Sequence, residues 1–215
     1  MSLTRGQIIS EALSQAGRTD LTSNARLWLN LFLEKIYKTQ DWDWLVKDSG
    51  VLALVQNGPV PTDYWKMKSA TLIRNGIPQL EIETVLSDEW ASLQRGASSA
   101  NGGPYKAWVN EDLRTFSYWP TPDNSFSWQF WYYYMPVLPT HTTSAGDSAT
   151  PKWELNDEIL IRAVQMKALY YNDDKRYNEG VQELMQEILS AKMNSAEFRA
   201  GRSKIRLGKS FRRRF

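Results

Sequence analysis

A chain of 215 residues is long enough to bury a hydrophobic core and suits one domain, or one domain with an insertion. It holds no cysteine and one histidine, His141, which excludes disulfides, thiolate catalysis and zinc sites of the cysteine type. The net charge is +2, and no run approaches the roughly 18 apolar residues of a membrane-spanning helix. We therefore expect a soluble protein made in the cytoplasm.

The first helix is predicted from Thr4 to Gly17. Thr4 and Gln7 have the spacing of a capping box, the apolar residues between them and Gly17 recur at helical spacing, and Gly17 suits the left-handed position after a helix. We expect this helix to pack on the next one.

The stretch from Asn24 to Leu45 predicts the central helix of the fold, followed by an aromatic plug. Its apolar residues cover most of the helix circumference, so other elements must wrap it; they are Leu27, Trp28, Leu29, Leu31, Phe32, Leu33, Ile36 and Tyr37. Only Arg26, Asn30, Glu34 and Lys38 form a polar line at steps of four, and we expect this line to face solvent.

The middle of the chain predicts strands separated by short turns. The expected strands are 51–55, 65–74, 80–84, 105–110, 113–119 and 127–135. Asn75-Gly76 predicts a tight hairpin turn, Ser87 begins a short helix, and residues 96–103 are expected to form a surface loop.

The strand from Ser127 to Met135 is the most aromatic stretch of the chain. Alternation places apolar residues on both faces, which is typical of a central strand covered on both sides or of an interface. We interpret it as core plus assembly contact, with carbohydrate or nucleobase stacking as the alternative. The predicted assembly surface comprises Trp128, Phe130, Trp131, Tyr132, Tyr133 and Tyr134.

Helical periodicity returns after a loop of residues 136–151, in which His141 is expected to be a surface residue. Asp157 to Tyr171 predicts a third long helix, and Tyr177 to Ala191 a fourth. The sequence therefore predicts an α+β fold. About four long helices from both chain ends form a bundle (residues 1–47 and 152–197), with a β-rich insertion (48–138) and a connecting loop (139–151).

The C-terminal segment from Phe198 to Phe215 is predicted to be a basic, extended arm. It holds eight cations and no acid, which leaves 18 cations against 24 acids and a charge of −6 on residues 1–197. Such segregation favours a partner with a negative surface, and the interspersed apolar residues favour a protein groove. The predicted partner-binding residues are Phe198, Arg199, Arg202, Lys204, Ile205, Arg206, Leu207, Lys209, Phe211, Arg212, Arg213, Arg214 and Phe215.

Three groups of residues resemble the head-to-tail adaptor proteins of short-tailed phages, which include the tail tubular protein A type and the portal-bound tail accessory factors. They are Asn24, Ala25, Arg26, Leu29 and Asn30; Trp42, Trp44 and Leu45; and Ala168, Tyr170, Tyr171, Asn172 and Tyr177. The resemblance covers the helical parts well and the β-rich insertion hardly at all.

The resemblance implies a structural protein of the virion that forms a ring beneath the portal protein. The ring would be homo-oligomeric and twelvefold, bind the next tail protein (a tube or nozzle) on its other side, and let DNA pass through its lumen. It implies no cofactor, no metal, no membrane and no small-molecule substrate.

Two alternatives from other classes remain open. A nucleic-acid-binding protein would use the arginine-rich segment and lose affinity steeply as salt rises. An enzyme acting on glycans such as peptidoglycan would use a carboxylate pair beside the Trp/Tyr strand, although no spacing in the sequence marks such a pair.

Overall fold

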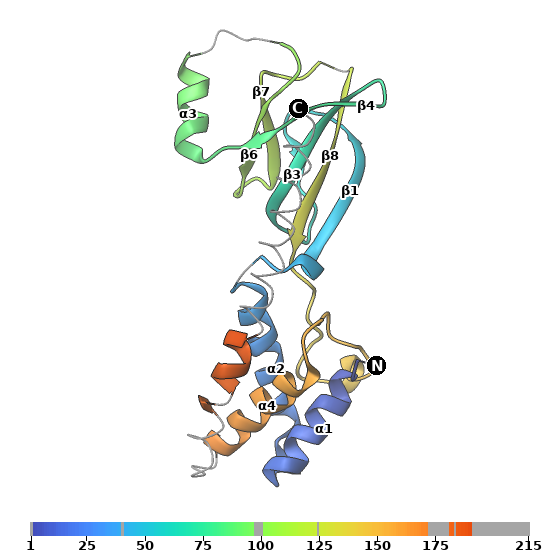
Figure 1. Cartoon of the computed structure of the whole chain (residues 1–215), viewed down its shortest axis with the longest axis vertical. Coiled ribbons are helices and arrows are strands. Elements are labelled where there is room, and N and C mark those ends of the chain that lie inside the picture. The colour runs from blue at the N-terminus through green and yellow to red at the C-terminus, as the bar shows by residue number, and fades with distance from the viewer. Residues whose placement is uncertain are drawn as a thin grey trace, which may run out of the picture. The chain divides into compact units, whose positions relative to one another are not determined.

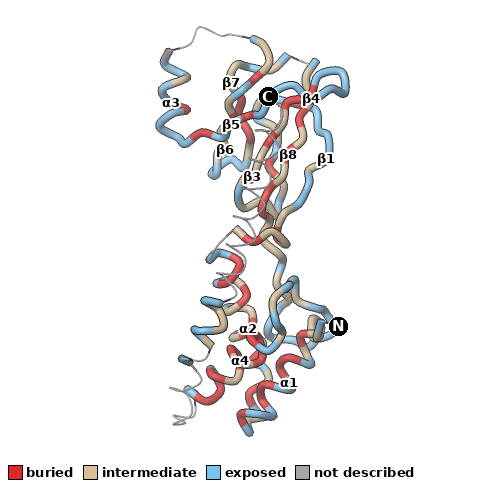
Figure 2. Tube along the Cα trace, viewed as in Figure 1, coloured by how far each residue is buried: buried red, intermediate tan, exposed pale blue. Residues whose placement is uncertain are grey.

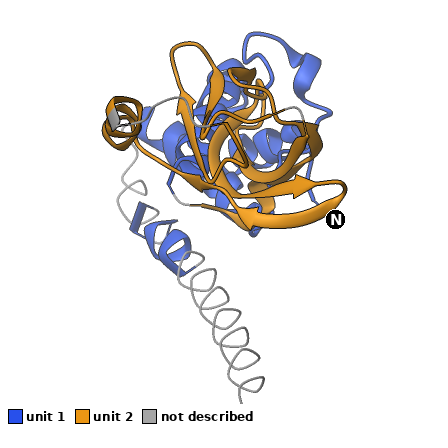
Figure 3. Ribbon diagram, turned by 90° about the horizontal axis from the view of Figure 1, so that it is seen from above, with its two compact units in different colours: residues 1–40, 138–215 blue, residues 41–137 orange. Residues whose placement is uncertain are grey.

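The structure is a computed structural model that describes residues 2–39, 41–96, 101–123, 125–171, 181–182 and 184–190. The chain forms two compact units, one from residues 1–40 and 138–215 and the other from residues 41–137 (Figure 3). We call them the helical unit and the β unit. None of the described helices is long and apolar enough to cross a bilayer.

The helical unit packs helices from both ends of the chain around one core (Figure 1). Its helices are α1 (Arg5–Ala16), α2 (Thr22–Tyr37) and α4 (Asp157–Tyr171). The predicted capping box at Thr4 and Gln7 is confirmed, and Gly17 ends α1 with a positive φ of 69°. The core residues include Ile8, Leu13, Leu29, Leu33, Leu160 and Val164, all at most 2% exposed.

The predicted fourth helix lies partly outside the described residues. Residues 181–182 and 184–190 are helical, and Arg162 on α4 lies 3.3 Å from the Glu187 carboxylate. The predicted α+β class is thus confirmed, with three long helices in the helical unit plus this described segment.

The β unit contains two four-stranded sheets that share one core (Figure 2). The first sheet has the order β1-β8-β3-β4 and the second the order β2-β7-β6-β5. All described pairs are antiparallel except β5 with β6. The strands are β1 (Val46–Ala53), β2 (Gly58–Pro59), β3 (Tyr64–Arg74), β4 (Ile77–Glu81), β5 (Glu83–Thr84), β6 (Lys106–Asn110), β7 (Thr115–Trp119) and β8 (Phe126–Tyr134).

Two local features of the β unit confirm the prediction from sequence. Asn75 and Gly76 join β3 to β4 with φ values of 52° and 75°, which are the two positive angles that a type I′ hairpin turn requires. The predicted short helix is α3 (Ser87–Gly96), which follows β5.

The structure corrects the prediction about the surface of α2. Leu27 and Leu31 are 37% and 55% exposed, so the helix is not wrapped on all sides. Arg26 and Asn30 do not face solvent, because their side chains bond to Asp147 and Pro139 in the loop before α4. Of the predicted polar line, Glu34 and Lys38 remain at the surface and form an ion pair at 2.6 Å.

Candidate protein-docking groove

The residues predicted from sequence to bind partners divide into two groups. Phe198 to Phe215 lies outside the described residues. All six residues of the predicted assembly surface lie on β8, which runs between β1 and β3 at the centre of the first sheet.

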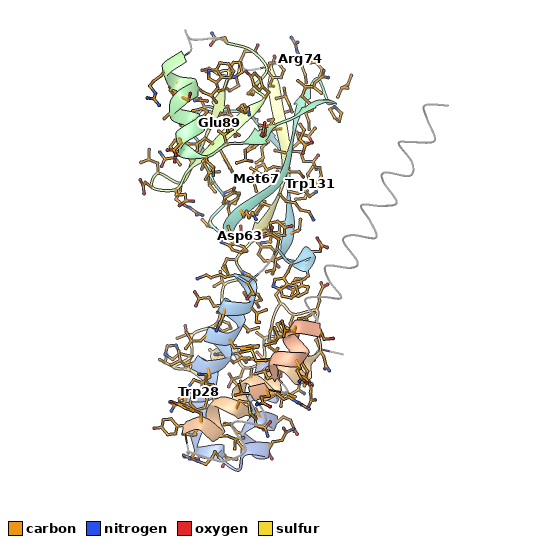
Figure 4. The ribbon with its side chains drawn as sticks, turned by 60° about the vertical axis from the view of Figure 1, so that its left-hand side comes forward. Trp28, Asp63, Met67, Arg74, Glu89 and Trp131 are labelled. Carbon is orange, nitrogen blue, oxygen red and sulfur yellow. The ribbon has the colours of Figure 1, made fainter. Side chains whose placement is uncertain are left out.

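Four of these six residues are buried, which confirms the core part of the interpretation for them. Trp128, Phe130 and Tyr132 point into the core between the two sheets, where Phe116 on β7 packs edge-on against Trp128 and Phe130. Tyr133, on the opposite face, is only 6% exposed. The role in assembly remains a prediction for all six, and of these Trp131 (labelled in Figure 4) and Tyr134 are half-buried.

A groove of about 970 Å³ lies within the β unit. One wall is the start of β3, and the others are the connection from β5 to α3 and the end of β6 with the turn into β7. Figure 4 labels Met67 on β3, which lines the groove, and Glu89 on the first turn of α3. The lining residues are Tyr64–Met67, Thr84–Ser87, Trp108–Asp112 and Arg114.

The apolar part of the groove is supported by aromatic packing. Tyr64 stacks on Tyr132 at 5.7 Å and meets Phe116 edge-on, and burial raises the pKa of the Tyr64 hydroxyl to about 12. Trp108 stacks on Trp90 of α3 at 5.7 Å. Leu86, by contrast, is 81% exposed, so the groove offers an apolar side chain that nothing in the described chain covers.

The groove and the adjoining first turn of α3 carry more carboxylates than cations. Four acids stand against two bases, which leaves a charge of −2; the acids are Asp88, Glu89, Glu111 and Asp112, and the bases Lys66 and Arg114.

The cations of the groove already have partners. Lys66 pairs with Asp41 at 2.8 Å, and Arg114 donates to the backbone oxygen of Pro61 at 2.8 Å. Glu111 and Asp112 are exposed and make no hydrogen bond or ion pair among the described residues. Their carboxylates are therefore available to a partner.

One lysine holds the α3 wall in place. The Lys106 ammonium donates to Glu83 at 2.7 Å and to Glu89 at 2.8 Å, and these two hydrogen bonds raise the pKa of Lys106 to about 12. The bridge joins β5, β6 and the first turn of α3. Together with the Trp90–Trp108 stack, it fixes α3 against the second sheet.

The groove was not predicted from the sequence, because its walls come from segments up to about fifty positions apart. In the sequence, Glu111 and Asp112 lie between the expected strands 105–110 and 113–119, which indicates only a turn. The exposed pair of acids in that turn was the one local signal.

Among the residues that the structure describes, no three histidine or acidic side chains are grouped to hold a metal ion, and His141 is exposed in a loop.

A second polar cluster lies in the helical unit, and we call Arg5, Arg26, Asn30 and Asp147 the polar clamp. Arg5 is 2% exposed, and its guanidinium donates to Asn30 Oδ1 at 3.2 Å and to the backbone oxygen of Arg26 at 3.3 Å. Desolvation of the buried guanidinium lowers the pKa of Arg5. The clamp attaches the loop before α4 to α1 and α2.

The clamp accounts for two residues of the phage adaptor resemblance, Arg26 and Asn30. Five of the others are buried: Ala25, Leu29, Leu45 and Ala168 are fully buried, and Trp42 is 1% exposed and stacks on Trp44 at 4.2 Å. Trp28 contacts Tyr171 of α4 at 6.1 Å between ring centres. Asn172 and Tyr177 lie outside the described residues. The buried ones are thus packing residues, Ala25, Leu29 and Ala168 in the helical unit and Trp42 and Leu45 in the β unit, whereas Tyr170 and Tyr171 are 62% exposed.

A comparison with protein families matches residues 3–213 to the model described as SU10 adaptor protein. A search of the curated proteins finds no match. The family match covers the helical unit, the β unit and nearly all of the basic C-terminal segment. The chain therefore belongs to the SU10 adaptor protein family, a family of phage head-to-tail adaptors.

Proposed function

We propose that the protein is a structural ring subunit at the head-to-tail junction of a phage virion. It binds the portal protein on one side and the next tail protein, a tube or nozzle, on the other. The ring is twelvefold, as the resemblance to phage adaptors implies, and DNA passes through its lumen. The role is structural and not enzymatic, as membership of an adaptor family indicates.

The observation that carries this proposal is the extent of the family match. It runs from residue 3 to residue 213, so both units and the basic segment belong to the adaptor architecture. The groove of the β unit supports a docking role, since it combines an exposed leucine with carboxylates that have no partner within the described part of the chain.

The residues from Phe198 to Phe215 bind the portal or a neighbouring subunit. Aromatic anchors within a cationic segment suit a protein groove lined with carboxylates, because the aromatic side chains supply buried area and arginines pair with carboxylates. Trp131 and Tyr134 contribute to assembly from the β unit.

The isolated protein is monomeric or weakly associated and closes into a ring on the portal. Residues 1–197 carry a charge of −6, so identical subunits repel one another until basic segments and a template offset the repulsion. A stable ring of the pure protein at micromolar concentration, detected by light scattering, would contradict this.

Electron microscopy of the protein mixed with its portal tests the adaptor role. Deletion of Phe198 to Phe215 should leave the melting temperature nearly unchanged but abolish decoration of the portal. The double change Phe211→Ser and Phe215→Ser should weaken decoration more than any single arginine change. Full decoration by the truncated protein would overturn portal binding by this segment, and silent Phe211 and Phe215 together with affinity for duplex DNA that falls with each arginine removed would favour nucleic-acid binding instead.

A further inference from the structure

We propose that the groove of the β unit binds the segment Phe198 to Phe215 of a neighbouring copy of the chain. The inference rests on the proposed ring and assigns the receptor for its basic segment. The groove belongs entirely to residues 41–137, so one subunit supplies the complete receptor.

Charge complementarity selects this occupant. The segment has eight cations and no acid, whereas the groove and the first turn of α3 carry −2. Glu111 and Asp112 are exposed and without partners in the described chain, so arginines can pair with them without first breaking an internal ion pair. Lys66 and Glu89 are engaged in ion pairs with other residues, so this pair and the exposed Asp88 are the attachment points.

Apolar complementarity adds the second contact. The segment places Phe211 directly before three arginines and Phe215 directly after them. The groove offers Leu86, Met67 and the half-buried rings of Trp65 and Trp108 beside its carboxylates. A volume of about 970 Å³ is at the upper end for a ligand site and admits two aromatic side chains with the backbone between them.

A neighbouring copy, rather than the same chain, supplies the segment for an electrostatic reason. Bodies of charge −6 repel one another, and a cationic segment bound across the boundary replaces that repulsion with attraction. The 25 residues after the last described position reach at most about 80 Å, so reach does not limit this exchange.

A labelled peptide of residues 198–215 titrated into the full-length protein, without portal, tests the groove. Fluorescence anisotropy should show saturable binding that Glu111→Gln with Asp112→Asn weakens about tenfold, as expected for loss of two charged contacts. The matched control, Glu154→Gln with Glu158→Gln, removes the same charge from exposed positions in the helical unit and should have little effect. A peptide with Phe211→Ser and Phe215→Ser should bind at least about tenfold more weakly.

Cysteine pairing distinguishes neighbouring copies from one chain, since the native sequence has no cysteine. A protein with Leu86→Cys mixed with one carrying Ser210→Cys should form a disulfide-linked heterodimer on oxidation. A Ser14→Cys partner for the Ser210→Cys protein, exposed on α1, should not. Equal losses of peptide affinity in both charge variants, or no preference for Leu86→Cys over Ser14→Cys, would overturn the assignment. Portal decoration measured separately would then still decide the adaptor role.

Discussion

Arg26 on α2 donates from both Nε and Nη2 to the carboxylate of Asp147, at 3.1 and 2.5 Å, across 121 positions of sequence. The same aspartate accepts a backbone hydrogen bond from Gly6 through its carbonyl oxygen and lies 3.6 Å from the Arg5 guanidinium. One acidic residue therefore ties the loop before α4 to both N-terminal helices. The loop is a structural part of the helical unit and not only a connection.

Asp147→Asn should destabilise the helical unit by about 2 kcal/mol, because it removes the charge that Arg26 and the buried Arg5 share. The hydrogen bond from Arg26 lowers the pKa of Asp147. Because the pKa of Asp147 is lower in the folded protein than in the unfolded chain, where it is about 4, the charged carboxylate stabilises the fold above about pH 4. This stabilisation is lost as pH falls through the folded-state pKa. Urea denaturation should therefore show a difference between wild type and variant at pH 7 that shrinks below pH 4. A difference independent of pH would contradict this.

Arg5→Leu should cost about 3 kcal/mol, since it leaves Asn30 Oδ1 and two backbone oxygens without their buried donor. The double variant Arg5→Leu with Asp147→Asn should lose less free energy of unfolding than the sum of the two single variants, because both residues belong to the polar clamp. Strict additivity would show that the two act independently.

Phe130→Ala and Trp131→Ala separate core from surface on β8. Phe130 is fully buried among Phe116, Trp128 and Tyr132, so its truncation should cost about 3–5 kcal/mol. Trp131→Ala should cost about 1 kcal/mol, because the side chain is only half-buried. Denaturant midpoints at an unchanged m-value measure both. Trp131→Ala should reduce ring assembly more than stability if this side chain is an assembly contact.

Gly76→Ala should destabilise the β unit by about 1 kcal/mol through backbone strain alone. Gly76 has a φ of 75°, and an added Cβ would meet no atom within 4 Å. Gly102→Ala is the matched control, since it also has open space but no positive φ, and its stability should be unchanged or slightly raised. Equal losses at both positions would show that strain at Gly76 is not the cause.

Local features could be predicted from the sequence, and long-range ones could not. The capping box at Thr4 and the turn at Asn75-Gly76 depend on residues within a few positions, so their spacing alone identifies them. Strand alternation placed Trp128, Phe130 and Tyr132 on one face, yet only the pairing of two sheets shows that β7 covers that face. The core part of the interpretation is confirmed for these three residues, and a role in assembly stays a prediction.

The polar residues of α2 show the same limit. Arg26 and Asn30 read as solvent-facing because polar side chains usually are, and the partners that bury them, Asp147 and Pro139, lie more than 100 positions away. The groove has the same origin, since β3, the β5–α3 connection and the β6–β7 turn meet only in the folded unit. Predicting the groove requires knowledge of which strands pair with one another, and not only of where each strand lies in the sequence.

Lys106→Met should loosen α3 without unfolding the β unit. The side chain bridges Glu83 and Glu89, so its loss leaves α3 attached mainly through the Trp90–Trp108 stack. Hydrogen exchange of the α3 amides should become faster while β3 and β8 stay protected, because they pair along most of their length. The pKa of Lys106 is about 12 in the folded protein, above the value of about 10 in the unfolded chain. The stability that the charged Lys106 contributes is therefore constant below about pH 10 and is lost as pH rises through about 12.

The matched control for Lys106 is Lys68→Met, which removes an exposed lysine of β3 that pairs with Asp43 and leaves α3 untouched. It should not change exchange in α3. Because the α3 wall shapes the groove, Lys106→Met should also weaken binding of the 198–215 peptide, even though it removes a cation and makes the groove more negative. Tighter binding by this variant, with α3 exchange unchanged, would mean that the groove attracts the peptide by charge alone and that the position of α3 is irrelevant.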